Sequence, residues 1–239
     1  MSDGFEVAEE VAGVLSLDEW MLVGGLMVHA HALMVDVPNM RATDDTDIVV
    51  GVVAGTGYGV AVQALESLGF HFQPSLDERT PAYQFLRGTD RIDLMVPDRV
   101  DKVRHARRDV IQVPGSSSAL KRTERFTTAG GVEMRVADLT GALSLKGAAY
   151  GLPSHDRLRH LQDAVVLFAC GGHRTLRAPS KSERGNINQL LRDLEKIPEA
   201  WSLTDEVVRR RAVQGIWALR PDWVVPRFVL VQRMGRRNQ

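Results

Sequence analysis

The sequence predicts an α/β (α+β) protein in which a mixed-sheet domain is followed by a mainly helical C-terminal domain. Segments with strand and helix patterns alternate over the first half, which is typical of a sheet covered by helices. After "VPGSSSAL" (113–120) the patterns become mostly helical. The chain has 239 residues, 44% of them hydrophobic, which is enough for one large domain or two small ones. We therefore divide it into residues 1–120 and 121–239.

Apolar periodicity and glycines at element ends predict the individual elements. Residues 7–17 have an amphipathic helical pattern, and "EWMLVGG" (19–25) is a short apolar strand that ends at a glycine pair. The second domain opens with a hairpin over 124–137. The other expected elements, in chain order, are a helix at 26–35, a strand at 46–53, a helix at 59–70, a hairpin of 82–88 with 91–97, and helical stretches at about 138–171 and 184–219.

Cysteine content and hydropathy indicate the cellular compartment in which the protein is expected. Cys170 is the only cysteine, so an intramolecular disulfide and a thiolate zinc cluster are excluded. No apolar run approaches the roughly 20 residues that span a bilayer. The sequence opens with acidic residues, whereas a secretory signal opens with basic ones. These observations predict a cytoplasmic protein without a membrane partner.

Charge is distributed unevenly along a chain whose net charge is zero. Residues 1–60 hold one basic and ten acidic residues, whereas residues 173–239 hold fourteen basic and seven acidic ones. This asymmetry indicates a cation site near one end and an anionic partner near the other. The alternative is that the basic segment is a solvated surface. In that case "RRR" (209–211) lies on a helix buried through Val207, Val208, Val213, Ile216 and Trp217.

Carboxylates gather at the start of the predicted 46–53 strand. Asp45 and Asp47 are two residues apart, so their side chains point to one face of a strand and repel each other unless a cation lies between them. Asp93, in "RIDLMV", lies inside an apolar strand, where an uncompensated charge is costly. Magnesium takes oxygen ligands of this kind. The alternative is that Asp44 and Asp45 cap a turn and Asp47 is a surface residue.

The glycine pair can supply the phosphate-binding part of such a site. Gly24 and Gly25 follow an apolar strand and open a helix, so their backbone N–H groups can face a phosphate that approaches closely. The chain order is then a glycine turn, a strand with D-x-D, and a later strand with one aspartate. This order predicts phosphate donors and metal ligands at one edge of a sheet.

These motifs resemble the polymerase β-type nucleotidyltransferase superfamily. In that fold the glycine turn holds a nucleoside triphosphate, and the three carboxylates bind two magnesium ions. The segment Arg41-x-Thr43-x-Asp45-x-Asp47 is similar to the R-x-[ST]-x-D-x-D of the toxin nucleotidyltransferases of the AbiEii and MenT type. The stretch 138–167 is similar to the helical segment of the same group.

The resemblance implies a role for each matched residue. Asp45, Asp47 and Asp93 are implied as metal ligands, and Gly24, Gly25, Arg41 and Lys146 as nucleotide-binding residues. Lys146 takes the position of the nucleotide-binding lysine, Asp163 that of an acidic residue of the second domain, and Thr43 that of a catalytic hydroxyl.

The activity implied is transfer of a nucleoside monophosphate from an NTP to an acceptor hydroxyl with release of pyrophosphate. In the toxin group the acceptor is the 3′ end of tRNA and a cognate antitoxin is a partner. The alternative is an aminoglycoside or lincosamide nucleotidyltransferase, which shares the glycine turn and D-x-D order and suits the acidic first half. A third hypothesis is a binding module that keeps the fold without catalysis.

Overall fold

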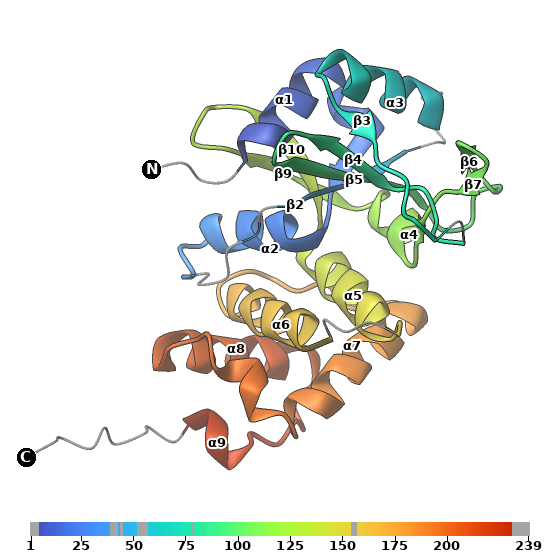
Figure 1. Ribbon diagram of the computed structural model, residues 1–239. Helices are drawn as coiled ribbons and strands as arrows, with labels where there is room; N and C mark the ends of the chain where they lie inside the picture. Colours follow the sequence, from blue (N-terminus) through green and yellow to red (C-terminus); the bar gives the residue numbers. More distant parts are fainter. Residues whose placement is uncertain are drawn as a thin grey trace, which may run out of the picture.

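The computed structural model describes residues 5–38, 43, 45–51, 57–77, 79–153 and 157–230. It confirms the predicted fold class, because a mixed sheet built from the first part of the chain is followed by a group of helices. In Figure 1 the sheet has α1 and α3 on one side and α2 and α5 on the other, and α6 to α9 continue away from it. None of the described helices combines the length and apolar character needed to cross a membrane.

The strands are paired in the order β3-β4-β5-β2-β1-β10-β9, and β8 pairs with the end of β5. The two central strands, β2 and β5, are parallel to each other, whereas β1 runs antiparallel to β2 and β4 antiparallel to β5. The apolar residues of β2 are fully buried, and so are those of β5 apart from the partly buried Met95, as expected of strands covered on both faces. The strands are β1 (Trp20–Leu22), β2 (Asp45–Val50), β3 (His71–Phe72), β4 (Gln84–Arg87), β5 (Asp90–Pro97), β8 (Gln112–Val113), β9 (Thr123–Thr127) and β10 (Glu133–Ala137), with β6 (Arg104–His105) and β7 (Arg108–Asp109) in a separate hairpin.

Helices cover the sheet and then build the second half of the protein. α2 contacts both the sheet and α6, and α5 packs between α6 and α7. The described helices are α1 (Glu6–Val14), α2 (Gly24–Leu33), α3 (Tyr58–Ser67), α4 (Ser116–Ala119), α5 (Leu139–Tyr150), α6 (Arg157–Gly171), α7 (Lys181–Leu194), α8 (Glu206–Leu219) and α9 (Arg227–Leu230), with 3₁₀ turns at Leu17–Glu19 and Pro198–Trp201.

The sheet continues past the predicted domain boundary at residue 120. β9 and β10 form the expected hairpin, but β10 pairs in parallel with β1, with Leu22 opposite Val136. The change from sheet to helices therefore comes at Asp138, which caps α5 by accepting a hydrogen bond from the N–H of Gly141 at 2.6 Å. The sequence pattern shows a hairpin but not its non-local partner.

One arginine joins the starts of two helices in the second half. Arg177 Nε lies 2.5 Å from Asp138 Oδ2, and the same guanidinium also pairs with Glu183 of α7. Glu183 in turn accepts a hydrogen bond from the N–H of Ser180, the N-cap of α7. These contacts hold the pKa of Glu183 at about 2, chiefly through the hydrogen bond from Arg177. The first turns of α5 and α7 are thus fixed to each other.

Glycines let the helices of the second half approach closely. A Cβ at Gly215 of α8 would lie 2.9 Å from the carbonyl carbon of Phe168 in α6 and closer still to its oxygen. A Cβ at Gly147 of α5 would lie 2.6 Å from the carbonyl carbon of Asn186 in α7. Because both obstacles are backbone atoms, a side chain cannot be accommodated by a change of rotamer.

Gly215→Ala is therefore expected to destabilise the protein by about 3 kcal/mol, since α6 and α8 must move apart. The measurement is urea denaturation followed by circular dichroism. Gly185→Ala on α7 is the matched control, because nothing lies within 4 Å of a Cβ there. That substitution is expected to stabilise the helix by roughly 0.5–1 kcal/mol. Equal effects of the two substitutions would contradict the close approach.

Candidate functional site

Three carboxylates meet on the two central strands. The parallel register of β2 and β5 places Asp47 directly opposite Asp93, and Asp45 opposite Arg91. Asp45 and Asp47 share one face of β2, as their spacing predicts. Asp93 is buried, with 8% of its surface exposed. The sheet therefore brings together the three aspartates expected from the sequence.

The Gly24 turn lies directly against Asp47. Val23 N–H donates to the carbonyl of Asp47 at 2.9 Å, and Gly24 begins α2 with φ at +65°. A Cβ on Gly24 would lie 2.5 Å from Cγ of Asp47 and closer still to its Oδ2. The backbone N–H of Gly25 donates to the Asp47 carboxylate. Both the left-handed backbone and the close approach therefore require glycine at position 24.

Arg91 lies between two of the carboxylates. Its Nη2 donates to Asp45 Oδ2 at 2.6 Å, and its Nε lies 3.3 Å from Asp93 Oδ1. The second pair of atoms is close but not aligned for a hydrogen bond, so Arg91 Nε and Asp93 Oδ1 are both buried without a hydrogen-bond partner among the described residues. The guanidinium thus supplies the positive charge that the repelling carboxylates need.

The environment of the site disfavours ionised carboxylates. Burial raises the pKa of Asp93 to about 7, and the charge of Asp47 adds to this effect, while Arg91 opposes it. Removal from water also raises the pKa of Asp47, although the positive charge of Lys146 lowers it in part. Such shifts are typical of sites where charge is held for function. A cation added here would be bound in exchange for protons.

Lys146 of α5 and Asp163 of α6 form an ion pair, and Lys146 also acts on one of these carboxylates. Lys146 Nζ lies 2.6 Å from Asp163 Oδ2, and their side chains are only 7% and 3% exposed. The lysine also acts electrostatically on Asp47, so charges of alternating sign connect α6, α5 and β2. The two residues of the helical segment therefore belong to the same cluster as the D-x-D motif.

The donor chemistry of this cluster suits a divalent cation with oxygen ligands. Asp93 Oδ1 is a buried acceptor without a hydrogen-bond partner within the described chain, and the carboxylate of Asp47 occupies the space that a side chain at position 24 would fill. In the arrangement described, however, no group of three or more Asp, Glu, His or Cys residues is placed to hold a metal ion. The oxygen donors thus suit such an ion in kind, whereas in the arrangement described Asp45 is paired with Arg91.

The structure gives less information on the other residues predicted for the site. Thr43 is partly exposed, just before β2 and outside any helix or strand. Arg41 and Asp44 lie outside the described residues. Arg91 and Gln84 join the cluster without having been predicted from the sequence. Gln84 faces Asp93 across the β4–β5 pair and hydrogen-bonds to it. The signal for Arg91 was its spacing, since residues two apart on a strand share a face.

His31, on the helix that begins at Gly24, contacts both the end of β10 and the segment after α6. Its Nε2 lies 3.0 Å from the carbonyl oxygen of Ala137, and Arg174 Nη1 lies 3.2 Å from its Nδ1. The ring therefore donates at Nε2, accepts at Nδ1 and is neutral. Burial lowers the pKa of His31 to about 4, and the charge of Arg174 adds to the shift.

This shift predicts acid-sensitive folding. The unfolded state binds the His31 proton with the ordinary pKa of 6.5, whereas the folded state binds it only near pH 4. His31 thus contributes stability that is complete above pH 6.5 and is lost as the pH is lowered towards 4, by about 3 kcal/mol in all, whereas the raised pKa of Asp93 acts in the opposite direction over the same range. Urea denaturation of the wild type and of His31→Gln at a series of pH values isolates the His31 contribution. The stability of the wild type relative to His31→Gln is expected to fall by this amount between pH 6.5 and 4, whereas the same fall relative to the exposed-site control His71→Gln would contradict the assignment.

Comparison with known proteins adds no family assignment. No protein-family model and no curated protein matches this chain.

Proposed function

We propose that this protein is a metal-dependent nucleotidyltransferase that moves a nucleoside monophosphate from an NTP to an acceptor hydroxyl. The observation that carries the proposal is the meeting of Asp45, Asp47 and Asp93 beside the Gly24 turn. A binding module has no evident need to hold Asp45 and Asp47 where their charges raise the pKa of buried Asp93, since such repulsion costs stability. An enzyme that transfers nucleotides needs such closely spaced carboxylates, because they bind the divalent ions that contact the phosphates.

Each group has a definite task in this reaction. Divalent ions held by Asp45, Asp47 and Asp93 would neutralise the triphosphate and lower the pKa of the acceptor hydroxyl. The Gly24–Gly25 turn would face the phosphates at the start of α2, where helix N–H groups favour negative charge, and the missing side chain of Gly24 lets the Asp47 carboxylate lie against that turn. Lys146 holds positive charge beside Asp47. The acceptor oxygen bonds to the α-phosphorus, the bond to the β-phosphate oxygen breaks, pyrophosphate leaves and the acceptor proton passes to solvent.

We further propose that the acceptor is the 3′ end of tRNA, so that the protein acts as a toxin controlled by a cognate antitoxin. The basic character of residues 173–239 supports an anionic acceptor. An aminoglycoside or lincosamide acceptor is the alternative, supported by the acidic first sixty residues, which would attract a cationic drug.

The test is to incubate the protein with Mg²⁺, each α-labelled NTP, total tRNA and a panel of aminoglycosides and lincosamides. We expect label on tRNA. Asp45→Ala and Asp47→Asn should each lower transfer at least about 100-fold, because positioning of the reacting groups is lost. Asp109→Asn, at an exposed carboxylate of β7, is the control and should keep full activity.

The outcomes separate the candidates. Label on a drug instead of tRNA would replace the toxin proposal with the resistance alternative. Transfer that persists at full rate in Asp45→Ala would reject the assigned site. A protein that labels no acceptor, and binds no NTP in the presence of Mg²⁺, would reject the nucleotidyltransferase proposal itself.

Arg91 is expected to compete with the divalent ion. Because its guanidinium pairs with Asp45 and lies against Asp93, removing it leaves two carboxylates uncompensated. Arg91→Ala should therefore tighten Mn²⁺ binding by roughly tenfold, after allowance for screening of this partly exposed side chain. Mn²⁺ titration followed by electron paramagnetic resonance measures the affinity without any turnover.

Arg87→Ala is the matched control for this titration. Arg87 also bridges two carboxylates, Glu10 and Asp90, but these lie away from the candidate site. Its removal should leave Mn²⁺ affinity unchanged. An equal gain of affinity in the two variants would show only the general effect of lost positive charge, and no gain in Arg91→Ala would exclude the competition.

A further inference from the structure

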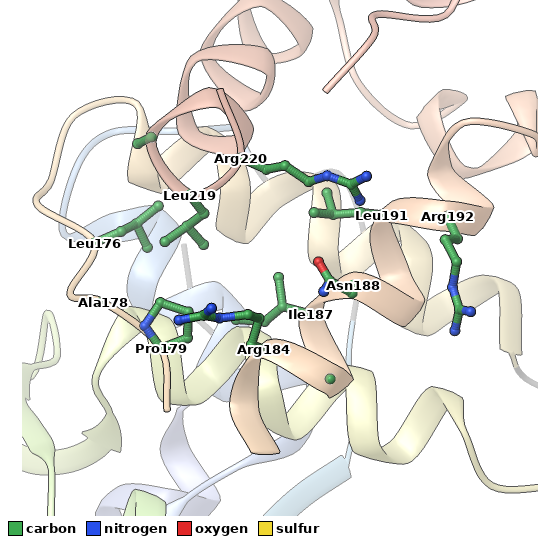
Figure 2. Close-up of a pocket in the computed structure, with 12 residues that line it drawn as sticks. Leu176, Ala178, Pro179, Arg184, Ile187, Asn188, Leu191, Arg192, Leu219 and Arg220 are labelled. Atoms are coloured by element: carbon green, nitrogen blue, oxygen red, sulfur yellow. The ribbon is translucent and has the colours of Figure 1, made fainter. Parts of the chain in front are cut away.

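A groove in the helical half lies apart from the carboxylate cluster. It has a volume of about 990 Å³ and runs between the start and middle of α7, the segment before α7 and the end of α8 (Figure 2). Its apolar surface comes from Leu176, Pro179, Ile187, Leu191 and Leu219. Ile187 and Leu191 are nearly fully buried and close the floor, while the other three are partly exposed.

Positive charge surrounds this apolar floor. Arg184 and Arg192 are two helical turns apart on α7, and Arg220 directly follows α8. In Figure 2 Arg184 and Arg220 extend beside the groove from its two walls, whereas Arg192 points outward. Among the residues that the structure describes, no aspartate or glutamate lines the groove. The positive charges of Arg184, Arg192 and Arg220 are therefore not neutralised by acidic side chains that line the groove.

The nearby carboxylates are engaged elsewhere. Glu183 pairs with Arg177, and Asp193 accepts a hydrogen bond from the Tyr150 hydroxyl at 2.5 Å. Over the described part of the chain, Arg184 and Arg192 have no ion-pair partner. Arg220 lies 3.5 Å from Asp222, whose side chain is 80% exposed, and such a surface pair contributes little. The groove thus combines a desolvated floor with unneutralised guanidinium groups.

We propose that this groove binds an acidic, amphipathic peptide segment of a partner protein. Leucine-type side chains of the segment would cover the floor, and its carboxylates would pair with Arg184 and Arg220. Arginine favours carboxylates because its planar fork can bind both oxygens at once. Asn188, which lies in the groove, offers an amide for the backbone of the segment.

RNA fits the groove less well. Protein sites for single-stranded RNA stack the bases on aromatic side chains, and the residues that line this groove include none. The floor is aliphatic, which suits the apolar face of a peptide. RNA and a second copy of this chain are nevertheless separate outcomes of the test below.

The experiment is selection from a phage-displayed random peptide library on the intact protein, followed by fluorescence anisotropy with the selected peptides. We expect sequences in which Asp and Glu alternate with Leu, Ile or Phe, and binding that weakens with added salt. Arg184→Glu and Arg220→Glu should each weaken binding by about tenfold or more, since each removes one charge-assisted contact. The matched control is Arg210→Glu, an exposed arginine of α8 outside the groove, which should bind normally.

Four results would overturn the proposal. The first is that the selected peptides lack acidic residues, and the second is that they still bind the double variant Arg184→Glu/Arg220→Glu. The third is that a single-stranded RNA oligonucleotide displaces the peptide and itself needs the same two arginines for binding. The fourth is that the protein self-associates and the double variant abolishes this self-association. Asp47→Asn should bind the peptides normally, so this test is independent of nucleotidyl transfer. Thermal melting of each variant confirms that these surface changes leave the fold intact.

Discussion

Replacing Gly24 with alanine is expected to lower nucleotidyl transfer at least about 100-fold, because even a small displacement of reacting groups has an effect of this size. The added Cβ would fall on the carboxylate of Asp47, so either that side chain or the start of α2 must move. The backbone also has φ at +65°, which disfavours any residue with a side chain. The measurement is transfer activity beside Mn²⁺ affinity, and both should fall.

Gly88→Ala separates the two causes. Gly88 has φ at +59°, close to that of Gly24, but nothing lies within 4 Å of a Cβ there. It therefore reports the effect of backbone strain without a collision. We expect a loss of stability of about 1 kcal/mol and full activity. If Gly24→Ala were as active as Gly88→Ala, the glycine turn would have no part in the site.

Replacing Lys146 of the Lys146–Asp163 pair is expected to cause a large loss of both stability and activity. Lys146→Met removes the buried cation beside Asp163 and Asp47, and breaking a buried ion pair in this way costs about 3–5 kcal/mol. For a chain of this length the melting temperature should fall by roughly 10 °C. Transfer activity should fall as well, because Lys146 would no longer balance the charge around Asp47. Differential scanning calorimetry and the transfer assay measure the two losses.

The double variant Lys146→Met/Asp163→Leu distinguishes stability from function. With both charges gone, most of the stability should return, because apolar side chains of similar size pack well in such positions. Activity should not return, since the positive charge beside Asp47 is still missing. Lys181→Met, at an exposed position of α7, is the control and should change neither quantity. Full activity of the double variant would remove Lys146 from the proposed mechanism.

Local patterns in the sequence were sufficient for most of the fold. The strands that carry Asp47 and Asp93 are apolar and bounded by turns, so their existence could be predicted, and two neighbouring parallel strands bring their aspartates together. Cys170 is buried and free, as its apolar surroundings indicated. The bridging position of Arg91 depends on the register between two strands, which periodicity alone does not give.

Non-local packing explains where the sequence analysis failed. The stripe predicted for α8 is only partly correct: Val208, Val213 and Ile216 are buried, but Val207 is 57% exposed and Trp217 44% exposed. Trp217 instead donates its indole N–H to the carbonyl of Trp223 at 3.0 Å and holds the segment that follows the helix. Which face of a helix is covered depends on its neighbours, here α6 and α9, and not on its own apolar residues alone.

The guanidinium of Arg177 sets an order in which the protein can be completed during synthesis. Strands up to Ala137 can pair as soon as they leave the ribosome, since domains generally fold from the N-terminus. Asp138, which caps the helix of Lys146, acquires its partner only when Arg177 has also emerged, and that arginine in turn pairs with Glu183. A nascent chain can therefore carry its aspartates on a formed sheet before the contacts of Arg177 fix the helix of Lys146, so that this cluster of charges is completed late in translation.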